Sequence, residues 1–319
     1  MIDKPLLSAV IILLTLSLVM SYSLSTYTVV HFHYSDFHFF IRQAMAIFIG
    51  FSTMVILTKL DPDIWFIRGG FALFFTFFFL MIIMQFLPSS LVNAVGGAKR
   101  WIRLGSLSVA PVEFFKIGFI FFIAWSFSKK ILKKPMTNFI DEVKMFAPYL
   151  GLFLFAVILI AVFQKDLGQV VVLGATLMVL FLFIGSSKKF FFSIVGLGFM
   201  AFIILIIIAP HRLKRILSWW GTVQDSILSI IPFDLEALRI AVTKEPYQIS
   251  NSLNAIHNGQ FFGVGLGNGQ FKLGYLSEVH TDFILGGITE EFGFLGLFLV
   301  TFTILFVVFR IFNSNKFTY

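Results

Sequence analysis

The sequence contains no cysteine and few charged residues among its 319 positions. Without cysteine the chain can form no disulfide, no thiolate ligand for a metal and no thiol nucleophile. Charged residues make up 13% of the chain and hydrophobic residues 58%, whereas soluble domains have about 25% and roughly 45–50%. The shortage of charge excludes a soluble globular enzyme, a disordered chain and a coiled coil, and it indicates a polytopic membrane protein.

The few charged residues are mostly basic, with 24 Lys and Arg against 16 Asp and Glu, which gives a net charge of +8. These basic residues are scattered between apolar runs, so nucleic acid is not an expected partner. In a membrane protein such an excess is typical of loops on the cytoplasmic face or of sites for anionic lipid.

Long apolar runs predict an all-α fold, a polytopic transmembrane helix bundle. A helix needs about 20 mostly apolar residues to cross a bilayer. Eight such helices are predicted, at residues 6–30, 43–58, 69–98, 109–128, 145–164, 167–187, 190–211 and 283–309. Residues 1–319 are interpreted as one membrane domain, in which residues 210–282 form a large extracytoplasmic loop before the last helix.

The distribution of lysine predicts that both termini lie in the cytoplasm. A lysine cluster at 129–134 and a pair at 188–189 then fall in inner loops, as the positive-inside rule requires. The loop at 210–282 is far longer than usual, and such loops are functional or disordered. Its two tryptophans argue against disorder, and residues 217–233 are predicted to lie in the membrane interface as an amphipathic helix.

Ionisable residues inside predicted spans or at their ends are expensive and are functional candidates. Glu113 and Lys116 are three positions apart, so they share a helix face; they form either an internal ion pair that locks the bundle or a functional pair. Asp166 is either the cap of the following helix, which is the preferred interpretation, or part of a polar site.

The densest polar signal is a glycine run at 263–269, followed by His280, Thr281 and Asp282. Glycines allow tight turns or close approach of the backbone to a ligand. Asp282 is predicted at the outer membrane boundary, where the last span begins. A carboxylate that is partly desolvated there would have a raised pKa suited to a general base. The alternative, which the residues alone favour slightly, is that Asp282 caps the last helix.

Three segments in this order resemble the SEDS family, which comprises the FtsW, RodA and SpoVE proteins. They read GAKRWIRLGSLSVAPVEFFK at 97–116, QKDLG at 164–168 and GVGLGNGQFKLGYLSEVHTDFILGGITEEFG at 263–293. The upstream segment YQISNSLNAIHNGQFFGVGLG fits as well. The form of the third segment is closer to the division branch, FtsW, than to the elongation branch, RodA.

The resemblance implies a peptidoglycan glycosyltransferase of the bacterial cytoplasmic membrane, active at the division septum. Such proteins polymerise lipid II into an undecaprenyl-linked glycan on the outer face, together with a class B penicillin-binding protein of the FtsI kind and other division proteins. The catalytic aspartate of the family corresponds to Asp282, so the resemblance places base catalysis ahead of capping.

The expected substrate site combines this base with cations and small residues. Basic side chains should face the pyrophosphate that leaves, and the substrate-binding candidates are Lys99, Arg100, Arg103, Arg212, Arg215, Gly265, Gly267, His280 and Thr281. Supporting roles are expected for Glu113, Lys116, Asp166 and Glu290. The sequence offers no dedicated metal cage, although Mg²⁺ or Mn²⁺ could bind through a few carboxylates and the substrate phosphates.

The chain also departs from the family pattern. Gly274 stands where a glutamate is common, and Ala110, Val112 and Lys165 replace other motif residues. The family has ten helices and this chain has eight predicted, so the expectation is a product truncated at its C-terminal end. Two other functions stay open at this point, a lipid II flippase and a non-catalytic scaffold of the division complex.

Overall fold

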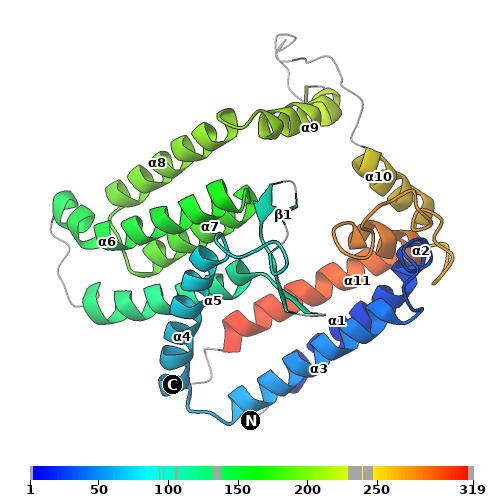
Figure 1. Cartoon of the computed structure of the whole chain (residues 1–319), viewed down its shortest axis with the longest axis horizontal. Coiled ribbons are helices and arrows are strands. Elements are labelled where there is room, and N and C mark those ends of the chain that lie inside the picture. Colours follow the sequence, from blue (N-terminus) through cyan, green and yellow to red (C-terminus); the bar gives the residue numbers. More distant parts are fainter. Residues whose placement is uncertain are drawn as a thin grey trace. The chain divides into compact units, whose positions relative to one another are not determined.

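The computed structural model describes residues 3–92, 94–95, 97–104, 107–131, 138–228, 239 and 247–314, and the described chain is mostly helical (Figure 1). It divides into two compact units, one formed by Met1–Thr58 with Lys214–Tyr319 and the other by Lys59–Leu213. Each unit has its own hydrophobic core. The first unit is therefore discontinuous in sequence, and the second is one continuous stretch.

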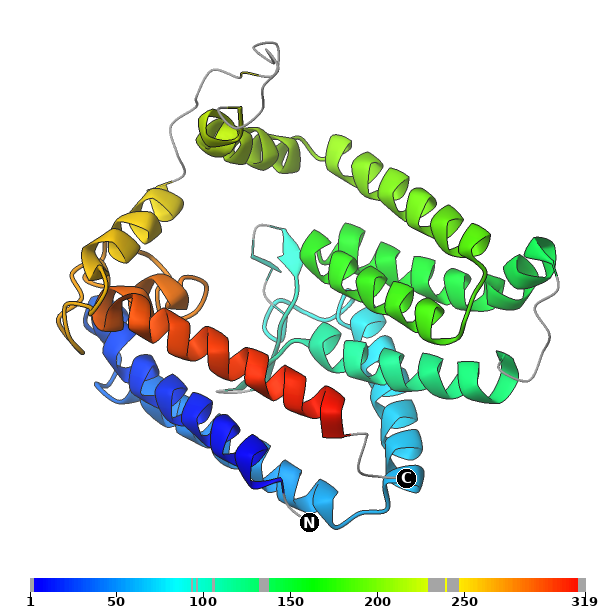
Figure 2. The same ribbon diagram turned by 180° about the vertical axis from the view of Figure 1, so that it is seen from behind.

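The first unit is built around the last helix of the chain. Its elements are α1 (Lys4–Leu24), α2 (Thr26–His31), α3 (His38–Thr58), most of α9 (Pro210–Leu228), α10 (Tyr247–Gly259) and α11 (Ile284–Ser314). Helix α11 packs against α1 and α10, and α1 packs against α3 (Figures 1 and 2). The buried core joins Met20 and Leu24 of α1, Ala255 of α10 and Ile288 of α11.

The second unit contains the remaining helices and two short hairpins. Its elements are α4 (Pro62–Ile83), β1 (Ala94–Val95), β2 (Ala98–Lys99), β3 (Ile102–Leu104), β4 (Leu107–Val109), α5 (Pro111–Ser126), η1 (Phe127–Ile131), α6 (Phe139–Ile158), η2 (Leu159–Phe163), α7 (Leu167–Phe183) and α8 (Lys188–Ile207). Both hairpins are antiparallel, with Ala94 opposite Lys99 and Ile102 opposite Val109.

Helices α4 and α5 pack closely because glycine lies at their crossing. A methyl group at Gly118 of α5 would overlap the backbone of Phe74 in α4. Small residues of this kind let membrane helices approach each other. The surrounding core is rich in phenylalanine, and Phe115, Phe119 and Phe146 are fully buried in it.

The predicted multi-pass bundle is confirmed. In the described chain, seven helices are long and apolar enough to cross a membrane: α1, α3, α4, α5 with η1, α6 with η2, α8 and α11. The remaining predicted span, at 167–187, corresponds to α7, a shorter apolar helix of 17 residues. Lys133 and Lys134, two members of the lysine cluster used to orient the chain, lie outside the described residues.

Several sequence predictions were wrong in their boundaries, and the span predicted at 6–30 ends as α1 at Leu24. The span predicted at 69–98 is α4, Pro62–Ile83, because Asp61 accepts a hydrogen bond from the Asp63 amide and Pro62 starts the helix. Beyond α4 the chain turns into the hairpins. The amphipathic helix predicted at 217–233 is α9, which begins at Pro210; residues 229–233 lie outside the described part of the chain.

The two ends of the first unit are joined by an ion pair. Arg310 near the end of α11 contacts Asp3, the cap of α1, with 2.8 Å between Nε and Oδ2. The hydrogen bond from Arg310 lowers the pKa of Asp3. The start of α1 and the end of α11 therefore lie close together.

Helix α11 is interrupted at Gly293, whose φ of 68° and ψ of −166° are not helical. Backbone groups of the segment that follows α10 form hydrogen bonds with the backbone of α11 at this interruption. The Val264 and Gly265 amides donate to the carbonyls of Glu290 and Glu291, both at 3.0 Å, and the Phe294 amide donates to the carbonyl of Gln260 at 2.9 Å. These bonds satisfy backbone groups that the break leaves open, which a membrane environment demands.

We expect Gly293→Ala to destabilise the protein by about 1–3 kcal/mol, because a non-glycine residue is strained at this φ and its methyl group would overlap the Phe261 carbonyl. The matched control is Gly196→Ala in α8, where a methyl group meets nothing within 4 Å. Thermal unfolding of the detergent-purified variants, followed by circular dichroism, measures the difference. Equal midpoints for the two variants would show that the interruption is not a constraint on folding.

Candidate functional site

The His280–Asp282 segment forms a turn just before α11. The amides of Thr281 and Phe283 donate to the Glu278 carbonyl at 3.1 and 3.2 Å, and the Thr281 hydroxyl lies 3.2 Å from Glu278 Oε2. The Asp282 side chain is exposed and makes no hydrogen bond or ion pair within the described part of the chain. It therefore does not cap α11 here, and the protein itself does not desolvate it.

His280 lies on the inner side of the same turn. Its ring packs against Phe39 of α3 with 4.7 Å between centroids. Burial lowers the pKa of His280, and the nearby carboxylates of Glu278 and Asp282 oppose that shift. The buried Nδ1 atom has no hydrogen-bond partner in the described structure. The partly buried imidazole thus lies beside the exposed carboxylate.

Glu290 organises the loop that precedes this turn. Its side chain is 1% exposed and accepts hydrogen bonds from the Asn258 side chain at 2.9 Å and from the Gln270 and Phe271 amides at 2.6 and 3.2 Å. Three donors from α10 and the loop converge on one carboxylate. Glu290 therefore ties the loop to the first turns of α11.

Sequence reasoning did not identify Lys272 and Ser23, which form a second buried cluster with Glu291. Lys272 Nζ lies 2.6 Å from Glu291 Oε1, and the Ser23 hydroxyl donates to both oxygens of Glu291 at 2.7 and 2.8 Å. The side chains of the ion pair are almost completely buried. The sequence signal for this cluster was the charged residue Glu291 inside an apolar span. Its partners could not be inferred, because they lie elsewhere in the sequence.

Gly265, Gly267 and Gly274 have different surroundings in this loop, and all three have positive φ angles. The Gly265 amide is occupied by the Glu291 carbonyl, whereas a methyl group at Gly267 would meet nothing within 4 Å. At Gly274 a side chain would meet the ring of Tyr27. Gly274, for which the resemblance implies a glutamate, therefore has a backbone angle that favours glycine and has no room for a side chain.

A basic cluster lies at one end of the second unit, where the segments 97–116 and 164–168 meet. Arg100 donates to the carbonyls of Gln164 and Lys165, both at 2.8 Å, and its guanidinium lies 3.7 Å from Asp166. Asp166 also accepts from the Gln169 amide at 3.3 Å and caps α7, as predicted. Lys99 donates to two carbonyls that follow α4, Gln85 and Leu87, at 2.7 and 3.2 Å.

Arg212 connects the end of α8 with η2 in the same unit. It donates to the Leu205 carbonyl at 2.7 Å and to the Ala161 carbonyl at 3.2 Å. Arg103 and Arg215 are exposed, and Arg215 on α9 has no hydrogen-bond partner among the described residues.

The predicted pair of Glu113 and Lys116 is an ion pair within α5. The two charged groups are 2.8 Å apart, and Gln169 of α7 donates to Glu113 at 2.7 Å. The pair therefore links α5 to α7. Among the described residues, no three His, Asp or Glu side chains gather to hold a metal ion.

Comparison with known proteins places this architecture in a family of membrane proteins. The family defined by FtsW, RodA and SpoVE, described as cell cycle proteins, matches residues 4–316. The chain therefore belongs to the FtsW, RodA and SpoVE family.

Relatives and solved structures agree with this placement. The probable peptidoglycan glycosyltransferase FtsW of Helicobacter pylori is 48% identical over 98% of this chain and 82% of its own length. Stage V sporulation protein E of Bacillus subtilis is 32% identical over 95% and 76%. The fold is similar to RodA of Thermus thermophilus, with a TM-score of 0.59 and 19% identity over 97% of this chain and 74% of that one.

We expect Lys272→Met to destabilise the protein by about 3–5 kcal/mol, because it leaves the Glu291 carboxylate buried and unpaired. The double variant Lys272→Met with Glu291→Leu should lose less, since no uncompensated charge remains. Denaturant unfolding of the purified variants measures both. A double variant as unstable as the single one would mean that packing around Lys272, and not its charge, stabilises the loop.

Stability should fall as the pH drops below about 6.5, since burial lowers the pKa of His280 from that ordinary value. The unfolded chain then binds a proton that the folded chain does not, so acid favours unfolding until the pH passes the folded pKa. His280→Gln should flatten the dependence of the unfolding midpoint on pH, whereas the exposed control His257→Gln should keep it. An unchanged slope in His280→Gln would contradict this assignment.

Proposed function

We propose that the chain is a peptidoglycan glycosyltransferase that polymerises lipid II on the outer face of the cytoplasmic membrane during septal wall synthesis. The observation that carries this proposal is Asp282, an exposed carboxylate without a hydrogen bond in the described chain, held at the start of a membrane helix. Membership of the FtsW, RodA and SpoVE family supports it, as does the name of the H. pylori relative.

In the proposed reaction the 4-hydroxyl of the lipid II N-acetylglucosamine attacks the anomeric carbon of the growing strand. A new glycosidic bond forms, the bond to undecaprenyl pyrophosphate breaks, and the anomeric configuration inverts. A neutral hydroxyl is a poor nucleophile, so Asp282 accepts its proton as general base. The carboxylate is suited to this because no protein donor competes for its oxygens in the described chain.

The pyrophosphate that leaves carries negative charge, which fixed cations stabilise. Of the basic candidates, Lys99, Arg100 and Arg212 already donate to backbone carbonyls. Arg103 and Arg215 are exposed, so a phosphate can reach their side chains. We assign the first three to holding the local structure as well as to electrostatic support. Mg²⁺ or Mn²⁺ would bind through the substrate phosphates.

The proposed partner is a class B penicillin-binding protein, which would crosslink the strands that this chain makes, alongside other division proteins. Support comes from a solved structure described as a peptidoglycan synthase complex that coordinates polymerisation and crosslinking. Its matching chain has a TM-score of 0.62 and 20% identity to this one.

We expect Asp282→Asn to reduce glycan polymerisation by about 100- to 10,000-fold, the usual contribution of positioned base catalysis. Its unfolding midpoint should be unchanged, because the carboxylate makes no hydrogen bond within the described chain. Glu278→Gln removes a neighbouring exposed carboxylate and should retain activity. The assay is polymerisation of lipid II by the purified chain in detergent, with products separated by length.

Long strands from Asp282→Asn would refute the assignment of the base. The same assay separates the two other functions. A lipid II flippase would make no polymer in detergent but would move lipid II across sealed vesicles, and a division scaffold would do neither.

A further inference from the structure

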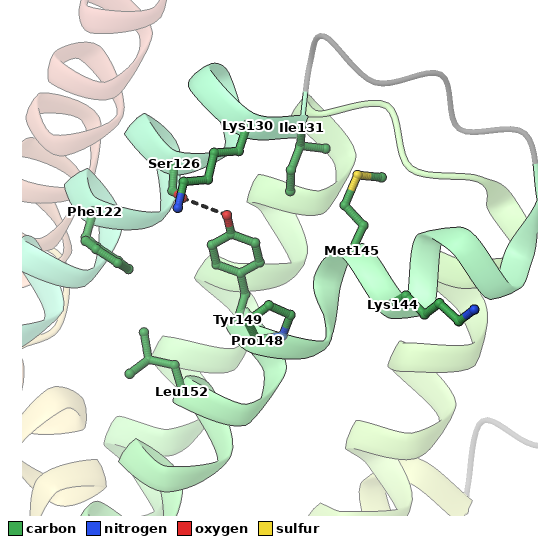
Figure 3. A pocket seen from close by; sticks show the side chains of 9 residues that line it. All are labelled: Phe122, Ser126, Lys130, Ile131, Lys144, Met145, Pro148, Tyr149 and Leu152. Atoms are coloured by element: carbon green, nitrogen blue, oxygen red, sulfur yellow. Dashed lines mark hydrogen bonds between the residues drawn. The ribbon is translucent and has the colours of Figure 1, made fainter.

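The second unit contains a pocket of about 510 Å³ between α5 with η1 and α6, away from the motif segments (Figure 3). Cavities that hold small ligands usually fall between about 300 and 1,000 Å³. The lining residues are Phe122, Ser126, Lys130, Ile131, Lys144, Met145, Pro148, Tyr149 and Leu152. Lys130 and Ile131 belong to the π-helical turn η1, and such turns are frequent at functional sites.

The polarity of the lining changes in the same order along both helices. Going from the end of α5 into the helix, the lining residues are Lys130, Ser126 and Phe122; going from the start of α6, they are Lys144, Tyr149 and Leu152. Among these six residues, ammonium groups come first, hydroxyl groups next and hydrocarbon last, while Ile131, Met145 and Pro148 add apolar surface near the lysines and Tyr149. A phospholipid has the same order, with phosphate, glycerol and acyl chain.

The hydroxyl layer is held by a hydrogen bond of 2.6 Å between Ser126 Oγ and the Tyr149 hydroxyl, both buried. In Figure 3 the Lys130 side chain points toward this pair, whereas Lys144 points away from it. Phe122 and Leu152 lie on one side of the pair, and Ile131 and Met145 lie on the other. Lys130 thus brings its charge to the hydroxyl pair, and apolar side chains lie on both sides of that pair.

The two lysines have no acidic partner in the described chain. Neither Lys130 nor Lys144 makes a hydrogen bond or an ion pair there. The nearby carboxylate of Glu142 is buried and accepts hydrogen bonds from the amide and hydroxyl of Ser187, which caps α8. The pocket therefore carries two positive charges that are available to a ligand.

We propose that this pocket binds an anionic phospholipid, with the phosphate at Lys130 beside the hydroxyl pair, an acyl chain along Phe122 and Leu152, and Lys144 adding positive charge to the pocket. Basic pockets between membrane helices bind anionic headgroups in this way. An acidic peptide would match the charges but not the hydrocarbon end, and an apolar lipid tail would match only that end. The proposal does not depend on the glycosyltransferase activity.

Native mass spectrometry of the full chain, titrated with phosphatidylglycerol or phosphatidylcholine of equal chain length, tests the proposal. We expect a preference for phosphatidylglycerol. Each of Lys130→Gln and Lys144→Gln should weaken its binding about fivefold, and the pair on the order of 25-fold. The matched control is Lys188→Gln with Lys189→Gln, which removes the same charge from exposed lysines outside the pocket and should leave binding unchanged.

A second comparison separates a lipid from a free anion. Long-chain phosphatidylglycerol should bind more tightly than a six-carbon-chain analogue, and millimolar inorganic phosphate should not displace it. Three results would overturn the proposal: equal binding of phosphatidylcholine, equal losses in the two double variants, or full displacement by inorganic phosphate without dependence on chain length. Because all four lysines are exposed, the substitutions should leave folding intact, and unfolding midpoints check this.

Discussion

The first unit depends on one constraint: the backbone groups exposed by the interruption of α11 must find partners. Gly293 breaks the helix, and the segment that follows α10 replaces the lost hydrogen bonds with its own amides and carbonyls. Glu290 and Glu291, which come just before the break, then fix the rest of that segment through Asn258, Lys272 and two further amides. The glycine run lies in this same segment, which leads on to the turn that presents Asp282.

In the second unit, arginine and lysine side chains provide hydrogen bonds to backbone carbonyls that lack a helical partner. Lys99, Arg100 and Arg212 each donate to carbonyls at or just beyond the ends of helices, where the helix itself provides no donor. From the sequence alone, cations of this kind could be interpreted as ligands for phosphate only. Their hydrogen bonds show that they bind backbone carbonyls at helix ends. Replacing one of them would therefore change the local structure together with the charge.

The spans could be predicted from sequence because hydropathy depends on composition over many residues. The start of α4 was wrong, although Asp61 and Pro62 are a local signal for it, because the apolar residues continue past the end of the helix. Asp166 as a helix cap and the pair of Glu113 with Lys116 were predictable, since both depend on spacings of a few residues. The contact of Lys272 with Ser23 was not, because 249 positions separate them in the sequence.

The discontinuity of the first unit also sets the order in which the protein can be made. Helices α1 and α3 enter the membrane early, but α11, which packs against α1, is synthesised only after the whole second unit, as is α10. The second unit is continuous in sequence, so it can pack while it is being synthesised. Ser23 can bind Glu291 only after the second unit has been made. Contacts between residues so far apart in sequence form slowly. Until the first unit is complete, α1 and α3 can therefore form incorrect contacts with other segments.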